Sequence, residues 1–104
     1  MEMTDFQILR VNILSDLGRR LRALRLDRNE TQLVFAQRIG TSRITLGKME
    51  KGNPNISIGL WVAASILLDR ENDWKGMFET QHDLFGQFEQ LDKPVRLRAR
   101  KKTQ

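Results

Sequence analysis

Apolar residues recur at every third or fourth position from residue 6 to residue 24, which is the period of one face of an α-helix. The members of this stripe are Phe6, Leu9, Ile13, Leu17, Leu21 and Leu24. The pattern predicts a first helix over residues 5–27, in one or two pieces, and the turn-forming run "DRNE" breaks it. The other face of this helix is basic and carries Arg19, Arg20, Arg22, Arg25 and Arg28.

Two short helices follow, separated by a single glycine. Thr31 is a suitable N-cap for a helix over residues 32–39, and Ser42 is a suitable N-cap for a helix over 43–51. Between them, Gly40 can adopt the left-handed conformation that ends a helix. This spacing predicts a helix-turn-helix, with a plain helical hairpin as the alternative. The residues predicted to hold the two helices together are the small Ala36, the turn residue Gly40, and the apolar Phe35, Ile39, Leu46 and Met49.

Two more helices are predicted beyond Gly52 and the loop "GNPN". The first, over residues 58–69 with Ser57 as its N-cap, is apolar on most faces. A helix of that kind is normally buried, so we expect it at the centre of the core, with Trp61 inside. The second, "WKGMFE", is predicted as a short fifth helix capped by Asn72 or Asp73.

The end of the chain has a different period. In "PVRLRAR", apolar residues alternate with arginines, which predicts a β-strand whose apolar side carries Val95, Leu97 and Ala99. Because the chain offers no second clear strand, we expect this one to pair with its copy in a homodimer. The preceding "TQHDLFGQFEQLDK" is left open between a short helix and an irregular arm.

Composition narrows the possible functions. The 104 residues include no cysteine and one histidine, so disulfides, cysteine-based zinc or redox sites and histidine clusters are excluded. The longest apolar run is far shorter than the ~20 residues of a membrane span, and the first ten residues do not resemble a secretory signal. A nucleotide-binding loop, a catalytic triad and a paired-carboxylate motif are all missing. We therefore expect a soluble cytoplasmic protein that is not an enzyme and that uses no cofactor and no metal.

Charge is unevenly distributed along the chain. Residues 18–52 have nine basic and three acidic residues, residues 53–92 have two basic and seven acidic residues, and residues 93–104 have six basic residues and no acid. Such asymmetry favours contact of the basic regions with a polyanion, while the acidic region avoids it or faces another partner. A solvated charged surface is the alternative.

The segment "LGRRLRALR…TQLVFAQRIGTSRITLGKMEKG" resembles the xenobiotic-response-element (Cro/CI-type) repressor family over residues 14 to about 70. The resemblance implies an all-α fold, namely a five-helix lambda-repressor-like DNA-binding domain that acts as a dimer on a two-fold operator. It also implies that Arg25 and Lys51 contact DNA phosphates.

The residues themselves lead to similar contacts. The N-terminal part of a recognition helix lies against base edges in the major groove, and here it carries Ser42, Arg43, Ile44, Gly47 and Lys48. The forked guanidinium of Arg43 suits guanine, and Ile44 suits a thymine methyl group. Gly47 allows close approach of the backbone, and Gln32 is placed to bind a phosphate. Glu50 is predicted to be structural, paired with an arginine of the first helix.

The chain continues with "GNPNISIGLWVAASILLDREND", an acidic segment and a "VRLRARKK" end. This part resembles the HipB-like subgroup, whose members are encoded beside HipA-type serine/threonine kinase toxins. This implies autoregulation of a toxin–antitoxin operon and binding of the kinase; a stand-alone dimeric repressor is the alternative. The predicted organisation is a DNA-binding domain over 1–71, a fifth helix and acidic arm over 72–94, and a basic strand and tail over 95–104. The aromatic candidates for partner binding are Trp74, Phe78, Phe85 and Phe88.

Overall fold

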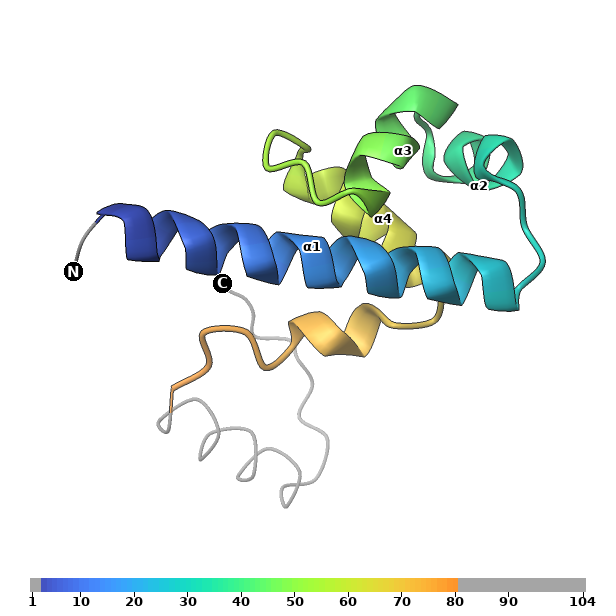
Figure 1. Ribbon diagram of the computed structural model, residues 1–104. Coiled ribbons are helices and arrows are strands. Elements are labelled where there is room, and N and C mark those ends of the chain that lie inside the picture. The colour runs from blue at the N-terminus through green and yellow to red at the C-terminus, as the bar shows by residue number, and fades with distance from the viewer. Residues whose placement is uncertain (1–2, 81–104) are drawn as a thin grey trace, which may run out of the picture. The chain divides into compact units, whose positions relative to one another are not determined.

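The computed structural model describes residues 3–80, and all regular structure within them is helical. Four α-helices, α1 (Met3–Asp27), α2 (Gln32–Ile39), α3 (Arg43–Glu50) and α4 (Ile58–Leu67), are followed by a 3-10 turn, η1 (Glu71–Trp74). Figure 1 shows their order along the chain. The chain divides into two units, Met1–Asn72 and Asp73–Gln104, which are described separately. No helix within residues 3–80 has both the length and the apolar character needed to cross a membrane.

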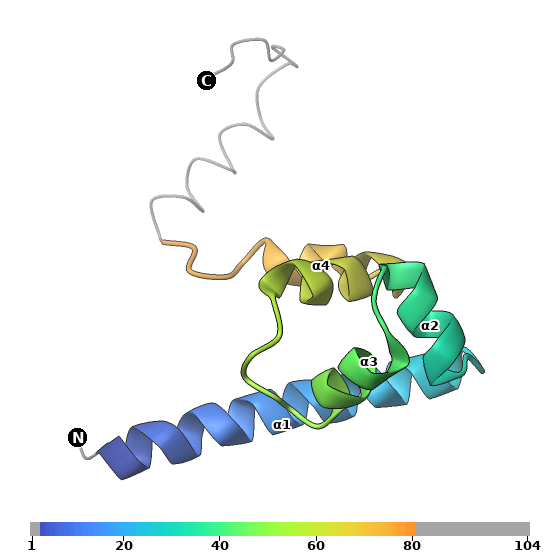
Figure 2. The same cartoon turned by 90° about the horizontal axis from the view of Figure 1, so that it is seen from above.

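The first helix is a single piece. The sequence predicted residues 5–27, and α1 covers the 25 residues Met3–Asp27. An α-helix of that length is about 37 Å long, which exceeds what the short helices beside it can cover. Figures 1 and 2 both show the first turns of α1 extending beyond α2, α3 and α4.

The turn between α2 and α3 was predicted correctly in position and in its capping residues. Gly40 adopts a left-handed conformation with φ 84° and ψ 32°. The N–H of Gly40 donates to the carbonyl of Gln37, and the N–H of Thr41 donates to the carbonyl of Ala36, 3.1 and 2.9 Å away. This is the Schellman arrangement, which satisfies the last carbonyl groups of α2. Ser42 Oγ then accepts the N–H of Thr45, and α3 begins.

The end of α3 lies directly against the backbone of α1, and two glycines make this approach possible. A Cβ added to Gly18 would lie 2.4 Å from the carbonyl oxygen of Glu50. A Cβ added to Gly52 would lie 2.9 Å from backbone atoms of Leu14 and Ser15, and Gly52 also has a positive φ of 83°. The close packing of α3 on α1 therefore requires glycine, which has no side chain, at both positions.

The core is small and is centred on α2 and α3. Its fully buried large side chains are Phe35, Leu46 and Met49, and Ala36 lies at the α2–α3 contact with no exposed surface. The other buried apolar residues are Leu21, Ile39 and Ala64. The helix-joining residues named from the sequence thus lie together as expected.

Helix α4 differs from the prediction. It ends at Leu67 rather than at residue 69, and only Ala64 is fully buried. Trp61 is half-buried at the edge of the core, while Ile58 and Ile66 are 65% and 56% exposed. The expectation of a fully buried helix was wrong because α4, which packs against α2, leaves Ile58 and Ile66 largely exposed.

The predicted fifth α-helix is also absent from the described residues. The chain forms η1 at Glu71–Trp74 and then an irregular turn, with Phe78 at a positive φ of 61°. Six residues that include Gly76 are too few to nucleate a stable α-helix, which accounts for the difference. The predicted aromatic contacts of Phe85 and Phe88, the strand of Val95, Leu97 and Ala99, and the domain boundaries beyond residue 80 lie outside the described residues.

Candidate nucleic-acid interface

The first turn of α3 is an exposed surface on a firmly fixed helix. Ser42, Arg43 and Ile44 are exposed, and Lys48 follows one turn later on the surface. Ile44 is 68% exposed, although it is a large apolar side chain next to the core helix residues Leu46 and Met49. Since those two residues are completely buried, the face that carries Arg43, Ile44 and Lys48 is held in one orientation.

The basic side chains of this surface have no acidic partner within residues 3–80. The ion pairs found there involve other arginines, and none includes Arg43, Lys48 or Lys51. Lys51 is exposed and forms the C-cap of α3. The positive charge of α3 is therefore directed to solvent, where an anionic ligand can reach it.

Gly47 lies between these side chains, and nothing inside the chain requires a glycine there. A Cβ at this position would have Gln32 Nε2, 4.0 Å away, as its nearest contact outside the helix backbone. The residue is half-buried within α3, in a regular helical conformation. An alanine would therefore fit against the described residues around this position.

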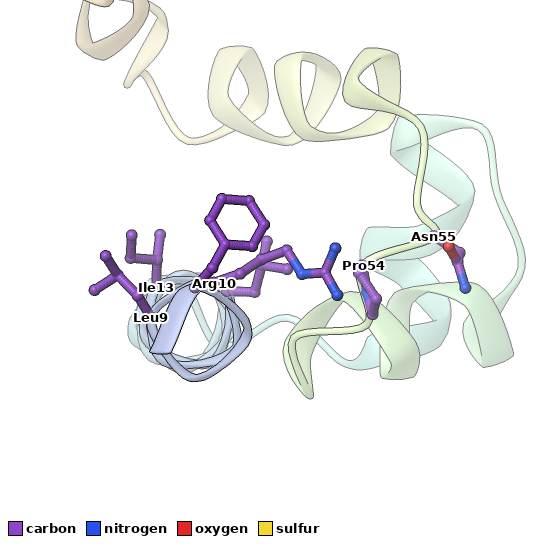
Figure 3. Close-up of a pocket in the computed structure, with 7 residues that line it drawn as sticks. Leu9, Arg10, Ile13, Pro54 and Asn55 are labelled. Atoms are coloured by element: carbon purple, nitrogen blue, oxygen red, sulfur yellow. The ribbon is translucent and has the colours of Figure 1, made fainter. Parts of the chain in front are cut away.

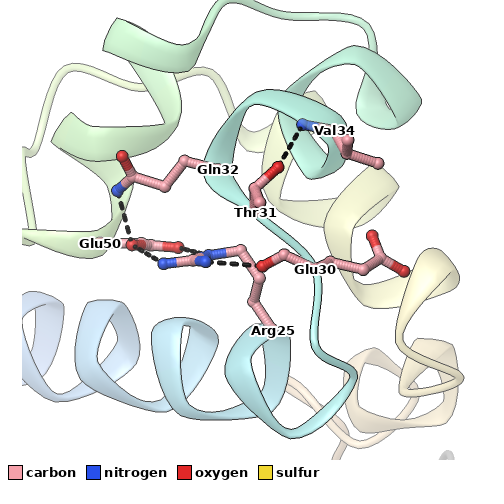
Figure 4. Close-up of polar contacts among 6 residues, drawn as sticks. All are labelled: Arg25, Glu30, Thr31, Gln32, Val34 and Glu50. Carbon is pink, nitrogen blue, oxygen red and sulfur yellow. Dashed lines mark hydrogen bonds and ion pairs between the residues drawn. The ribbon is translucent and has the colours of Figure 1, made fainter.

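Arg25 has a different position from the one predicted for a phosphate contact. It is 5% exposed, and its guanidinium grips Glu50 with two hydrogen bonds, Nε to Oε2 at 2.6 Å and Nη2 to Oε1 at 3.0 Å. Its Nη1 donates to the backbone carbonyl of Glu30 at 2.8 Å (Figure 4). The guanidinium is thus largely engaged inside the protein, and the phosphate contact of Arg25 stays a prediction.

The same contact confirms the structural role predicted for Glu50. That residue is 7% exposed on α3, and its carboxylate joins Arg25 of α1 to Gln32 of α2. Forked arginine–carboxylate pairs fix geometry well, and burial makes the loss of either partner costly. Three helices are thus joined at one carboxylate.

Gln32 is the first residue of α2 and is half-buried. Its Nε2 donates to Glu50 Oε1 at 3.0 Å, so part of its side chain already has a partner inside the protein. Beside it, Thr31 Oγ1 accepts the N–H of Val34 (Figure 4). This places Gln32 between the buried Arg25–Glu50 pair and Gly47 on the surface of α3.

The proposed protein-binding aromatics lie in part among the described residues. Trp74, at the end of η1, is half-buried, and Phe78 is 92% exposed. Phe78 lies in a turn rather than on the predicted helix.

Two features of this region were not predicted. Arg38 Nη1 donates to Glu30 Oε2 at 2.6 Å, and Arg28 Nε lies 3.6 Å from the same oxygen. The contact with Arg38 joins the α1–α2 loop to α2. The position of this acidic residue next to the N-cap Thr31 was the sequence signal for these contacts.

The exposure of the apolar residues in the first half of α1 was also not predicted, because periodicity identifies the apolar face of a helix but not what covers it.

Comparison of the chain with protein-family models, with curated proteins and with solved structures found no match.

Proposed function

We propose that this protein binds double-stranded DNA through a helix-turn-helix formed by α2 and α3, and that it acts as a sequence-specific transcriptional repressor. The observation that carries the proposal is the exposed start of α3, with Arg43, Ile44 and Lys48 on a helix whose opposite side is completely buried. A recognition helix needs this combination, because base contacts require side chains held at fixed positions. The tight turn at Gly40 and the resemblance of the sequence to Cro/CI-type repressors support it.

Each residue on α3 has a role that follows from its chemistry. Arg43 donates both ends of its guanidinium to guanine N7 and O6, and Ile44 packs on a thymine methyl group. Because Gly47 has no side chain, the edge of a base or a backbone phosphate can approach the helix closely there. Lys48 lies with Arg43 and Ile44 on the surface that faces the bases. Lys51 and the N-terminus of α2 at Gln32 contact phosphates, which set affinity and position rather than sequence preference.

The experiment begins with selection of preferred sites from random duplexes by the full chain, followed by titration at several salt concentrations. Arg43→Ala is expected to weaken binding of the selected site by about 1–3 kcal/mol and to relax preference at one base position. Arg22→Ala is the matched control, since it removes the same charge from the exposed surface of α1. Equal losses on selected and random duplexes would show that Arg43 contacts phosphate and would contradict the specific role.

Lys51→Ala separates the two kinds of contact. A phosphate contact contributes similarly on every sequence, so its loss is expected to lower binding uniformly and to reduce the slope of log affinity against log salt by about one. If no duplex is preferred over competitor DNA at moderate salt, the protein is a nonspecific nucleic-acid binder and the repressor proposal fails.

A second role, association with a HipA-like kinase toxin, follows from the resemblance to HipB-like proteins. It is supported by the acidic composition of residues 53–92 and by the 92% exposed Phe78. Purification of the tagged chain from its host with nuclease present is expected to recover a kinase at near-equal amount, and Phe78→Ala is expected to weaken its retention. Recovery of the chain alone would favour a stand-alone dimeric repressor.

A further inference from the structure

We infer that the first half of α1 is a dimerisation surface, which pairs in parallel with the same helix of a second copy of this chain. This surface consists of Phe6, Leu9, Ile13 and Leu17, and it is distinct from the C-terminal strand expected to link two copies. The inference does not depend on DNA binding.

The exposed apolar area is the first observation. Phe6, Leu9 and Ile13 are 51–57% exposed and Leu17 is 39% exposed, although all four lie on one stripe of a continuous helix. Monomeric proteins rarely leave a contiguous apolar stripe open to water. From Gly18 onward the same helix is covered by α3, so the open stripe ends where the core begins.

The spacing of this stripe is that of a two-stranded coiled coil. Phe6, Leu9 and Ile13 occupy successive a, d and a positions of a seven-residue repeat. A β-branched residue at a with leucine at d favours two parallel strands, and Ile13 and Leu9 meet that preference. The repeat changes at Asp16, and Leu17 continues the stripe one position later.

Charge decides the orientation of the pair. Asp5 and Arg10 flank the stripe at the g and e positions. In a parallel pair the g residue of one helix faces the e residue five positions later on its partner, which brings Asp5 to Arg10 on both sides of the dyad. An antiparallel pair sets e against e and g against g, so that like charges meet.

The stripe itself forms one wall of a groove, because Phe6, Leu9 and Ile13 line it. It has a volume of about 710 Å³ and lies between Leu9, Arg10 and Ile13 of α1 and Pro54 with Asn55 of the α3–α4 loop. Figure 3 shows the Arg10 side chain extending from α1 towards Pro54. A partner helix that carries an acidic residue fits this mostly apolar groove, and α1 of a second copy brings Asp5 to it.

Single cysteines test the arrangement directly, because the chain contains none of its own. Phe6→Cys and Ile13→Cys are each expected to form a disulfide with the same position of a second full-length chain under mild oxidation. An antiparallel pair would instead bring residue 6 to residue 13 and would separate equal positions by about 10 Å along the axis, too far for a disulfide. Ile8→Cys is the matched control, since Ile8 is 54% exposed on another face of the same helix.

Charge reversal gives a second and independent measurement. Arg10→Asp is expected to weaken the dimer by about tenfold in sedimentation equilibrium, because two attractive pairs become repulsive. The double variant Asp5→Arg with Arg10→Asp is expected to restore most of the affinity. Cross-linking at residue 8 equal to that at 6 and 13, or a disulfide only in a mixture of the residue 6 and residue 13 variants, would overturn the inference. A dimer held by the C-terminal strand alone would also overturn it, since none of the α1 cysteines would then cross-link.

Discussion

The two halves of α1 have the same apolar period but different surroundings. In the second half, Gly18, Leu21 and Arg25 are buried against α3 and its neighbours. In the first half, Phe6, Leu9 and Ile13 repeat the spacing of Leu21 and Leu24 yet remain about half exposed. The difference shows that an apolar stripe specifies a surface that needs a partner, and that the partner can be the rest of the fold or another molecule.

The largest effect is expected at the polar contact that fixes the second half. Glu50→Ala removes the only carboxylate that bonds to the Arg25 guanidinium among the described residues and leaves a buried positive charge, which costs about 3–5 kcal/mol of unfolding free energy. Urea unfolding followed by circular dichroism measures it. Asp16→Ala, which breaks the exposed ion pair with Arg19, is the control and is expected to cost under about 1 kcal/mol. Equal losses would mean that the buried pair does not anchor α1.

A matched pair of leucines compares the two halves most directly. Leu21→Ala is expected to destabilise the fold by about 2–5 kcal/mol, because Leu21 is 4% exposed and its removal leaves a cavity. Leu9→Ala is expected to change the unfolding free energy of a single chain little, because Leu9 is 57% exposed. Its effect is expected to appear only as protein concentration rises and the proposed dimer forms. A large loss for Leu9→Ala that does not vary with concentration would show that the first half packs within the chain.

The next effect is that of Gly18→Ala, where α1 crosses α3. Helix propensity alone would make this change stabilising, but we expect it to destabilise the fold. Gly18→Ala places a Cβ 2.4 Å from the Glu50 carbonyl oxygen, so backbone must shift, and we expect a loss of about 1–3 kcal/mol. Alanine is the better helix former by about 1 kcal/mol, which would otherwise stabilise α1. Gln7→Ala, at an exposed position of the first half, is the control and is expected to be neutral or slightly stabilising. A stabilising Gly18→Ala would remove close helix packing as the reason for this glycine.

Most of the helices follow from local sequence, and the exceptions have physical causes. Thr31, Gly40, Ser42 and Ser57 are capping residues whose chemistry is local, and the structure places them as predicted. The pairing of Glu50 with an arginine of α1 was predicted, but the burial of that residue, Arg25, was not, because arginine is normally exposed.

The same distinction applies to α4 and to the proposed site. The composition of α4 indicates an apolar helix, but composition cannot show which of its faces meets α2. The exposed positions Arg43, Ile44 and Lys48 were named from their place after an N-cap, which is again a local signal. Contacts between distant segments decide which residues are buried, and these contacts cannot be inferred from a single sequence.

The smallest effect tests whether the first half of α1 unfolds together with the second. Asn12 is exposed in the middle of the first half, and alanine is the better helix former by about 0.5 kcal/mol. Asn12→Ala is expected to slow amide hydrogen exchange of residues 3–11 by about twofold, measured at low protein concentration, with little change around Leu21. The reason is that the apolar side chains of the first half are about half exposed, so this half is expected to fray before global unfolding. A different result would be equal slowing of exchange in both halves, together with a rise of about 0.5 kcal/mol in the unfolding free energy measured with urea. Then α1 unfolds as one cooperative element. The exposed stripe would then be stabilised from within the chain, and the contrast between the halves would be one of solvent exposure alone.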